Sequence, residues 1–366
     1  MRIALVYDRV NKWGGAERVL LALHELFPDA VLYTSLYSPE KAKWVQIFPE
    51  VIPSLINKIP LIRDKHEYLG IFMPVVFESL DLSRYDLVVS VTSEAAKGVI
   101  TGPSTLHLCY CLTPTRYLWS HYDTHFKGRS FKGMTKPIVS YLRRWDKAAA
   151  QRPDVMIAIS TAVQDRIKEY YGRGSIVIHP PLALSLYSSR AGHDDKKERG
   201  RNCFLIVSRL VRYKKVDLAI EAFNELGLPL YVVGVGKEER KIKKMAKPNI
   251  KFLGQLTDAK LASYYKKARA LIMPQEEDFG LVAVESIAAG TPVIAYRAGG
   301  ALDIIKEGVN GIFFDKQTKD DLIEAIERFG ESQFNAKIIK QSAEKFSQKN
   351  FKKRFIKIVR EHTGQL

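Results

Sequence analysis

The chain alternates short apolar strands with amphipathic helices, and this rhythm restricts the fold more than any other feature. Parallel strands need a crossover between them, usually a helix, so the rhythm predicts an α/β protein with doubly wound parallel sheets. A proline pair, Pro180-Pro181, and the polar stretch after it interrupt the rhythm. We therefore expect two Rossmann-like domains. The expected strands are 3–7, 30–34, 87–90, 106–111 and 155–158 before the break, and 204–207, 230–233, 250–253, 270–273 and 293–295 after it.

Length and composition agree with two domains. The chain has 366 residues, of which 46% are hydrophobic, enough for two ordinary cores. We place an N-terminal domain at 1–182, an exposed linker at 183–202 and a C-terminal domain at 203–345. The remaining run, 346–366, is basic and has the periodicity of an amphipathic helix.

Residues 276–295, EEDFGLVAVESIAAGTPVIA, carry the most specific functional signal. Gly280 opens a predicted helix after an acidic turn, and a helix N-terminus offers unpaired N–H groups and a positive dipole end to an anion. Glu277 precedes this helix and Glu285 lies within it, with seven residues between them. An anion site with a carboxylate on each side fits a ligand that has a phosphate in its middle and hydroxyls at both ends. A nucleotide-sugar has that shape.

This segment resembles the E-x7-E signature of retaining glycosyltransferases of family 4, whose two Rossmann-like domains face a cleft (the GT-B fold). Three other elements resemble the same family in the same order. They are the glycine-rich loop WGGAER at 13–18, the strand, arginine, loop and lysine of 204–214, and the strand, turn and helix of 249–268. The resemblance runs from residue 3 to about 356. It implies that the N-domain binds the acceptor, the C-domain binds the nucleotide-sugar, and the C-terminal helix returns to the N-domain.

The resemblance also implies roles for individual residues. Arg209 and Lys214 would stabilise the negative charge that grows on a departing nucleotide diphosphate, since guanidinium and ammonium groups are strong phosphate partners. Glu277 would accept hydrogen bonds from the transferred sugar, and Glu285 from the ribose. Further donor contacts are implied for the backbone of the helix start and of the first glycine loop, namely Phe279, Gly280, Leu281, Gly14 and Gly15.

The family is not thought to need a protein nucleophile, because front-face attack is the usual explanation of retention. The paired carboxylates are therefore not interpreted as the acid and nucleophile of a hydrolase. No DxD pair suits a cation-dependent transferase, and His121 and His125 lack a third ligand for zinc. We expect neither a metal nor another cofactor.

The segment HLCYCLTPTRYLWSHYD at 107–123 indicates a subgroup. It resembles a motif of bacterial mannosyltransferases that build O-antigen and related polysaccharides. This implies mannose from GDP-mannose as the donor and a lipid-linked or oligosaccharide acceptor. Arg116, Tyr117 and Trp119 would contact the acceptor, with ordinary wall packing as the alternative. Leu112 replaces the usual histidine, which is credited with touching the sugar, so donor and activity stay open; Asp303, where glutamate is commoner, is a milder departure.

The net charge of +17 reflects 57 Lys and Arg against 40 Asp and Glu. Such an excess favours an anionic partner or belongs to a lysine-rich, solvated surface. The basic and apolar segment 55–77 suits the surface of an anionic membrane, although its apolar residues could equally be core. No nucleic-acid module is recognisable and the basic residues are spread along the chain, so we expect no nucleic-acid partner.

Cysteine usage and hydropathy indicate a compartment. Cys109, Cys111 and Cys203 form no paired framework, which favours a reducing environment. No apolar run approaches about eighteen residues, and the first strand is too short for the apolar core of a signal peptide. We expect a cytoplasmic protein, with peripheral attachment to the membrane as the open alternative.

Three other functional classes fit the sequence to different degrees. A nucleotide-sugar epimerase of the same fold would need its own acid and base carboxylates and histidines, and the E-x7-E spacing argues against it. A non-catalytic sugar-nucleotide or membrane-surface binding protein would fit a degenerate transferase marked by Leu112. A dinucleotide-dependent oxidoreductase is disfavoured, because Gly234-Val235-Gly236 is not followed by the third glycine of the fingerprint.

Overall fold

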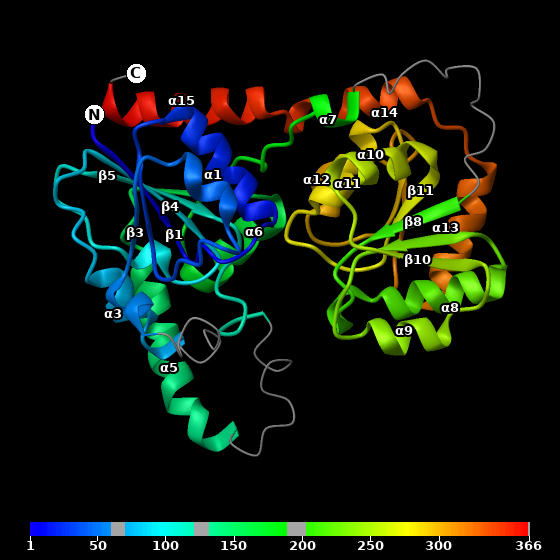
Figure 1. The fold of residues 1–366 in the computed structure, drawn as a ribbon, viewed down its shortest axis with the longest axis horizontal. Helices are drawn as coiled ribbons and strands as arrows, with labels where there is room; N and C mark the ends of the chain where they lie inside the picture. The colour runs from blue at the N-terminus through cyan, green and yellow to red at the C-terminus, as the bar shows by residue number, and fades with distance from the viewer. Residues whose placement is uncertain (60–69, 121–131, 189–202, 365–366) are drawn as a thin grey trace. The chain divides into compact units, whose positions relative to one another are not determined.

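The computed structural model describes residues 1–59, 70–120, 132–188 and 203–364. The chain forms two compact units, Met1–Pro180 with Phe351–Leu366, and Pro181–Asn350 (Figure 1).

The first unit is built on a seven-stranded sheet whose paired strands are all parallel. The first strand pairs on both sides, with Leu5 opposite Leu32 on one neighbour and Val89 on the other. The point where the strand order reverses therefore lies between the first and the fourth strand, which is where ligands bind in doubly wound folds. In spatial order the strands are β3 (Val51–Pro53), β2 (Val31–Thr34), β1 (Ile3–Tyr7), β4 (Leu87–Thr92), β5 (Leu106–Cys111), β6 (Val155–Ala158) and β7 (Ile176–Val177).

Local sequence signals fix the helices of this unit. The Ser160 hydroxyl caps the start of one helix by accepting from the Val163 N–H at 3.1 Å, and Gly172 ends the same helix with a φ of 65°. Glycine is favoured at that end because the left-handed region strains other residues. The helices are α1 (Gly15–Leu26), α3 (Met73–Glu78), α5 (Lys132–Ala149) and α6 (Thr161–Tyr171).

The second unit repeats the same topology with a six-stranded parallel sheet. Its strand order again reverses between its first and fourth strand, where Leu205 lies opposite Leu271. In spatial order the strands are β10 (Ile250–Gly254), β9 (Leu230–Val233), β8 (Cys203–Val207), β11 (Ala268–Met273), β12 (Val293–Tyr296) and β13 (Gly311–Phe314). Two parallel-sheet α/β domains of Rossmann type confirm the predicted fold class.

The core of the second unit lies between this sheet and two of its helices. Phe204 of β8 contacts Phe223 and Phe329, with ring centroids 5.2 and 6.0 Å apart. All three rings are buried in one apolar cluster, and this burial holds the two helices against the sheet. The helices are α7 (Ser185–Ser188), α8 (Val216–Leu226), α9 (Glu239–Met245), α10 (Asp258–Lys267), α11 (Leu281–Ala288), α12 (Ala301–Ile304), α13 (Lys319–Glu331) and α14 (Ala336–Ser342).

The C-terminal helix α15 (Gln348–Thr363) packs on the first unit, as predicted (Figure 1). Its Phe355 ring lies 6.3 Å from that of Phe27, and its Phe351 ring 5.8 Å from that of Tyr110. On the polar side Arg354 Nη2 donates to the Val177 carbonyl at 2.6 Å. The apolar stripe of the helix therefore completes the core of the first unit.

The structure differs from the predicted boundaries in two places. Residues 181–188, expected at the end of the N-terminal domain and in the linker, lie in the second unit. There the Tyr187 side chain of α7 is buried, with its ring 6.2 Å from that of Tyr265. Residues 346–350 also lie in the second unit, where the Phe346 ring is 5.6 Å from that of Phe279. The rest of the predicted linker, 189–202, lies outside the described residues.

Candidate functional site

The switch point of the second unit brings together Lys214 and Glu277. Lys214 ends a short 3-10 turn after β8, and Glu277 follows β11. Lys214 Nζ donates to Glu277 Oε1 in a salt bridge, and Gln275 Nε2 donates to the same oxygen at 2.9 Å. Lys214 is only 8% exposed. Because a buried charge without a partner is strongly destabilising, each group depends on the other.

Arg209, the second predicted cation, lies two residues after β8 and is held by a tyrosine. Its Nη2 donates to the Tyr213 hydroxyl at 2.7 Å, while Lys214 Nζ lies 5.1 Å from the centroid of the same ring. Tyr213 therefore links both cations at one edge of the sheet. The sequence analysis missed Tyr213 and Gln275, although each is within two residues of a predicted site residue.

Helix α11 begins beside this pair and has the predicted form. Gly280 precedes it with a φ of 102°, a left-handed conformation that favours glycine, and as the N-cap residue it has no side chain with which to cap the helix. A helix start that follows a glycine in this way suits an anion. Leu281, the first helical residue, is half-buried, so the helix start is accessible.

Glu285 lies on α11, as predicted, and is buried rather than solvated. It is 4% exposed, and its Oε2 accepts a hydrogen bond from the Tyr265 hydroxyl at 2.8 Å. Tyr265 lies on α10, twenty residues before Glu285 in the sequence. The E-x7-E motif therefore does not indicate which residue is the partner of Glu285.

Two glycines after β12 fix the backbone of the site. A Cβ atom on Gly300 would lie 2.3 Å from the Phe279 Cα, and one on Gly299 would lie 2.3 Å from the Glu277 carbonyl oxygen. The Gly300 N–H donates to that carbonyl at 2.8 Å. The loop at 298–300 thus packs directly on the loop that carries Glu277, an approach that only glycine permits.

A second glycine pair supports the loop after β8. A Cβ atom on Gly234 would lie 1.9 Å from the Ser208 carbonyl oxygen, and one on Gly236 would lie 2.2 Å from that of Leu210. These glycines let the ends of β8 and β9 approach each other around Arg209. Their close packing gives a structural reason for the Gly234-Val235-Gly236 sequence.

In the first unit the predicted glycines Gly14 and Gly15 begin α1. Gly14 has an extended backbone, with a φ of −178°, which any residue adopts, so a close contact is the relevant constraint. A Cβ atom there would lie 3.2 Å from Glu17 Oε2. Glu17 is 1% exposed, and its Oε1 accepts from the Tyr7 hydroxyl at 2.7 Å. The glycine loop therefore packs directly against a buried carboxylate.

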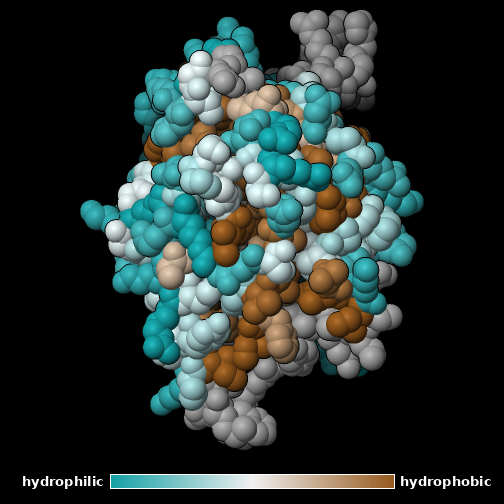
Figure 2. Space-filling view, turned by 90° about the vertical axis from the view of Figure 1, so that its left-hand side faces the viewer, coloured by the Kyte–Doolittle hydropathy of each residue, from teal (hydrophilic) through white to brown (hydrophobic). Residues whose placement is uncertain are grey.

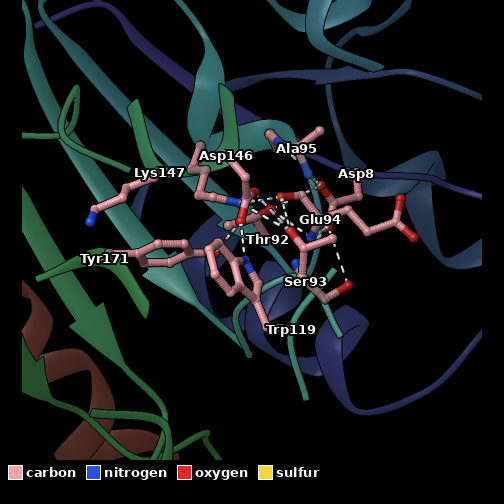
Figure 3. A network of polar contacts seen from close by, with 12 residues as sticks. Asp8, Thr92, Ser93, Glu94, Ala95, Trp119, Asp146, Lys147 and Tyr171 are labelled. Carbon is pink, nitrogen blue, oxygen red and sulfur yellow. Dashed lines mark hydrogen bonds and ion pairs between the residues drawn. The ribbon is translucent and has the colours of Figure 1, made fainter. Parts of the chain in front are cut away.

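The three predicted acceptor residues differ in their surroundings. Trp119 Nε1 donates to Asp146 Oδ2 at 2.7 Å (Figure 3). The Trp119 ring stacks on Tyr170 with centroids 5.1 Å apart. Burial, and then the charge of Glu94, raise the pKa of Tyr117. Arg116 is half-buried beside them. One face of the Trp119 ring is thus covered by protein, which the sequence could not show.

The position of Leu112, where the family usually has histidine, is defined by the sheet. Its N–H donates to the Thr92 carbonyl at 2.8 Å, so it follows β5 directly beside the end of β4. The side chain is half-buried. A hydrophobic group therefore lies at the carboxyl edge of the first sheet.

The described residues contain neither a candidate metal site nor a candidate membrane span. In those residues no group of three or more His, Cys, Asp or Glu side chains is placed to bind a metal ion. His121 and His125 lie outside the described part of the chain. Among the helices described, none combines the length and the apolar character needed to cross a membrane.

Most of the second unit matches the model of a known protein family. Residues 191–352 match the family model described as glycosyl transferases group 1. This range contains Arg209, Lys214, Glu277 and Glu285. This part of the chain is therefore similar to the glycosyl transferases group 1 family.

Curated relatives are similar over part of their length. An uncharacterized glycosyltransferase of Methanocaldococcus jannaschii is 29% identical over 212 residues, which cover 57% of this chain and 58% of that protein. The GDP-mannose-dependent alpha-mannosyltransferase of Corynebacterium glutamicum is 29% identical over 205 residues, covering 53% and 48%. In these matches the chain spans about half the length of the curated relatives.

Solved structures share the fold along the whole chain. The crystal structure of Anabaena HepE in complex with UDP superposes with a TM-score of 0.71, covering 99% of this chain and 100% of that one. The sequences are 19% identical, so the likeness concerns the GT-B fold alone.

The packing of the glycine loop leads to a stability prediction. Gly300→Ala should destabilise the protein by about 1–3 kcal/mol, because the new methyl group overlaps the Phe279 backbone. Gly330→Ala on α13 is the control, since a Cβ atom there meets nothing within 4 Å and alanine favours a helix. Thermal unfolding measures both variants. Equal melting temperatures for the two would contradict the close packing of the 298–300 loop.

Proposed function

We propose that the chain is a retaining glycosyltransferase that moves a hexose, mannose from GDP-mannose, to a lipid-linked or oligosaccharide acceptor in cell-surface polysaccharide synthesis. The salt bridge of the buried Lys214 with Glu277, beside the start of α11, carries this proposal. It lies where doubly wound sheets bind their ligands. The family match over 191–352 and the E-x7-E spacing support the same chemistry.

In the proposed reaction the bond between the sugar C1 and the diphosphate oxygen breaks, and the acceptor oxygen bonds to C1 on the same face. The leaving phosphate takes the acceptor proton. Negative charge grows on the diphosphate, and Lys214, Arg209 and the N–H groups at the start of α11 would stabilise it. This stabilisation is electrostatic and needs neither a protein nucleophile nor a metal.

The two glutamates would orient the donor at its two ends. Glu277 already accepts hydrogen bonds from Lys214 and Gln275, so its carboxylate is fixed for a hydroxyl of the transferred sugar. Glu285, oriented by Tyr265, would accept from the ribose. Holding both ends of the donor supplies the orientation on which transfer depends.

The mannose assignment rests on sequence similarity. The resemblance of 107–123 to mannosyltransferases and the GDP-mannose-dependent relative from Corynebacterium glutamicum support GDP-mannose. A fold relative, HepE, has been solved with UDP-glucose, which makes UDP-sugars the natural comparison. Leu112 favours a second candidate, a sugar-nucleotide binding protein without turnover.

A donor panel tests the proposal. GDP-mannose, UDP-glucose, UDP-N-acetylglucosamine, UDP-galactose and dTDP-rhamnose are compared by thermal shift and then by nucleotide release. We expect GDP-mannose to raise the melting temperature most, since a ligand of the folded state stabilises it by about 2.7 kcal/mol at 100 times its Kd. Lys214→Ala and Glu285→Ala should abolish the shift. Arg212→Ala, a change at an exposed neighbouring cation, is the matched control and should keep it.

The outcomes separate the candidate functions. A shift with nucleotide release supports the transferase, whereas a shift without release from any donor supports the binding protein. A shift that survives Lys214→Ala and Glu285→Ala would show that the nucleotide binds elsewhere.

We also propose that the first unit binds the surface of an anionic membrane. Hydrophobic side chains gather on the face of this unit shown in Figure 2. Leu55, Phe72 and Val75 are 76%, 57% and 66% exposed, and Lys58 is exposed beside Leu55 in the same segment. Apolar side chains next to cations suit an anionic leaflet, and the net charge of +17 has the complementary sign.

Vesicle binding tests this surface. The protein should sediment with vesicles of phosphatidylcholine and phosphatidylglycerol, and less with phosphatidylcholine alone, because anionic lipid attracts the cations. The double variant Phe72→Asp and Val75→Asp should reduce binding about tenfold or more, since it removes apolar contact and adds negative charge. Ile338→Asp, at a 48% exposed site on α14, is the control. Equal binding by both variants would contradict the proposal.

A further inference from the structure

The switch point of the first unit also holds a cation and a glutamate. Arg9 lies two residues after β1, and Glu94 two residues after β4. Arg9 Nη2 donates to Glu94 Oε1 in a salt bridge whose side chains are 17% and 19% exposed. The pair thus occupies the same topological position in the first sheet as Lys214 and Glu277 in the second. It is partly open to solvent at the edge where such sheets bind ligands.

The carboxylate of Asp8 fixes the turn that carries Glu94. Asp8 accepts six hydrogen bonds at 2.6–3.3 Å, which come from the hydroxyls of Thr92 and Ser93 and from the four N–H groups of residues 93–96 (Figure 3). Successive N–H groups that converge in this way elsewhere bind phosphate. Here Asp8 takes that place, so this turn is filled by the protein itself and disfavours a phosphate.

A buried ion pair joins the same turn to helix α5, which also holds the loop after β5 through hydrogen bonds. Lys97 Nζ lies 2.5 Å from Asp146 Oδ1, and both side chains are 1% exposed. Asp146 also accepts from the Thr115 hydroxyl at 2.9 Å and from Trp119 Nε1 at 2.7 Å. Burial alone would lower the pKa of Lys97, but the charge of Asp146 outweighs it and raises this pKa. The loop that carries Tyr117 is therefore fixed to the turn that carries Glu94.

The further hydrogen-bond donors of Arg9 and acceptors of Glu94 indicate the kind of ligand that the pair fits. Among the described residues, the Arg9 guanidinium hydrogen-bonds to Glu94 alone, although a guanidinium has five N–H donors. A carboxylate has about four acceptor sites, and Arg9 occupies one on Glu94. Donors and acceptors side by side match neighbouring hydroxyls of a sugar, since each hydroxyl both donates and accepts. The pair is neutral as a whole and Asp8 already occupies the N–H groups of the turn, so a neutral sugar fits better than a phosphate.

We infer that Arg9 and Glu94 bind hydroxyl groups of the acceptor sugar and determine which acceptors are used, with Asp8 as the positioning residue that holds Glu94 in place. This inference rests on the proposed transferase function and deepens it. Arg9 and Glu94 lie outside the residues matched by the family model, 191–352.

Kinetics with synthetic acceptors tests the inference. Octyl α-mannoside, octyl β-glucoside and octyl β-galactoside are supplied with the donor identified by the panel above, and nucleotide release is followed with and without each glycoside. Glu94→Gln should raise the KM for the best glycoside about tenfold, because it replaces a charge-assisted hydrogen bond with a neutral one. The ratio of glycoside-dependent to donor-only release should fall by a similar factor.

Glu78→Gln is the matched control. Glu78 belongs to the same unit, pairs with Arg152 at 2.6 Å, and is 29% exposed, so the change removes a similar ion pair away from the switch point. It should leave the KM for the glycoside unchanged. Arg9→Lys keeps the charge but removes the planar fork, and should raise this KM as Glu94→Gln does. Melting temperatures show whether each variant is folded, and Arg9→Lys decides the question should Glu94→Gln fail to fold.

Three results would overturn the inference. One is a glycoside KM that is the same in Arg9→Lys, Glu94→Gln and Glu78→Gln. Another is that no glycoside accelerates nucleotide release by the unmodified protein, although release from the donor alone continues. The proposed function would then hold, but the acceptor site inferred here would not. Absence of release from every donor, with or without glycoside, would instead contradict the proposed function itself, and the inference with it.

Discussion

The salt bridge of Lys214 and Glu277 is the interaction on which the candidate site depends. Lys214 is buried, and its charge without a partner would be destabilising, so the loops after β8 and β11 must present both groups together. Glycines make that possible, because Gly236 allows close packing beside Leu210 and Gly300 allows it beside Phe279. The chemistry proposed for the donor thus relies on backbone contacts that no larger residue permits.

The two units share the same strand order at their switch points, but the charges there differ. In the second unit α11 starts after a glycine, and Arg209 adds a positive charge to the pair of Lys214 and Glu277, which suits a diphosphate. In the first unit the N–H groups of 93–96 are taken by Asp8, and the neighbouring pair of Arg9 and Glu94 is neutral overall. A phosphate therefore fits the second unit, and neutral hydroxyl groups fit the first.

The sequence predicts the fold well because periodicity and glycine positions are local signals. It predicts ten of the strands and the helix at Gly280, but β3, β7 and β13 are too short or too closely flanked by loops to show a period. It identifies Lys214, Glu277 and Glu285 by motif. It does not reveal Tyr265, the partner of Glu285, or Asp146, the partner of Trp119. Residues that lie far apart in the chain form no motif with a fixed spacing. The stacking of Trp119 on Tyr170 depends on tertiary packing in the same way.

A crystal structure with GDP bound tests the central claim most directly. The account predicts that Lys214 Nζ contacts a diphosphate oxygen, that Glu285 accepts a hydrogen bond from the ribose, and that the start of α11 faces the diphosphate. A nucleotide bound away from the carboxyl ends of β8 and β11, with Lys214 contacting only Glu277, would contradict the account.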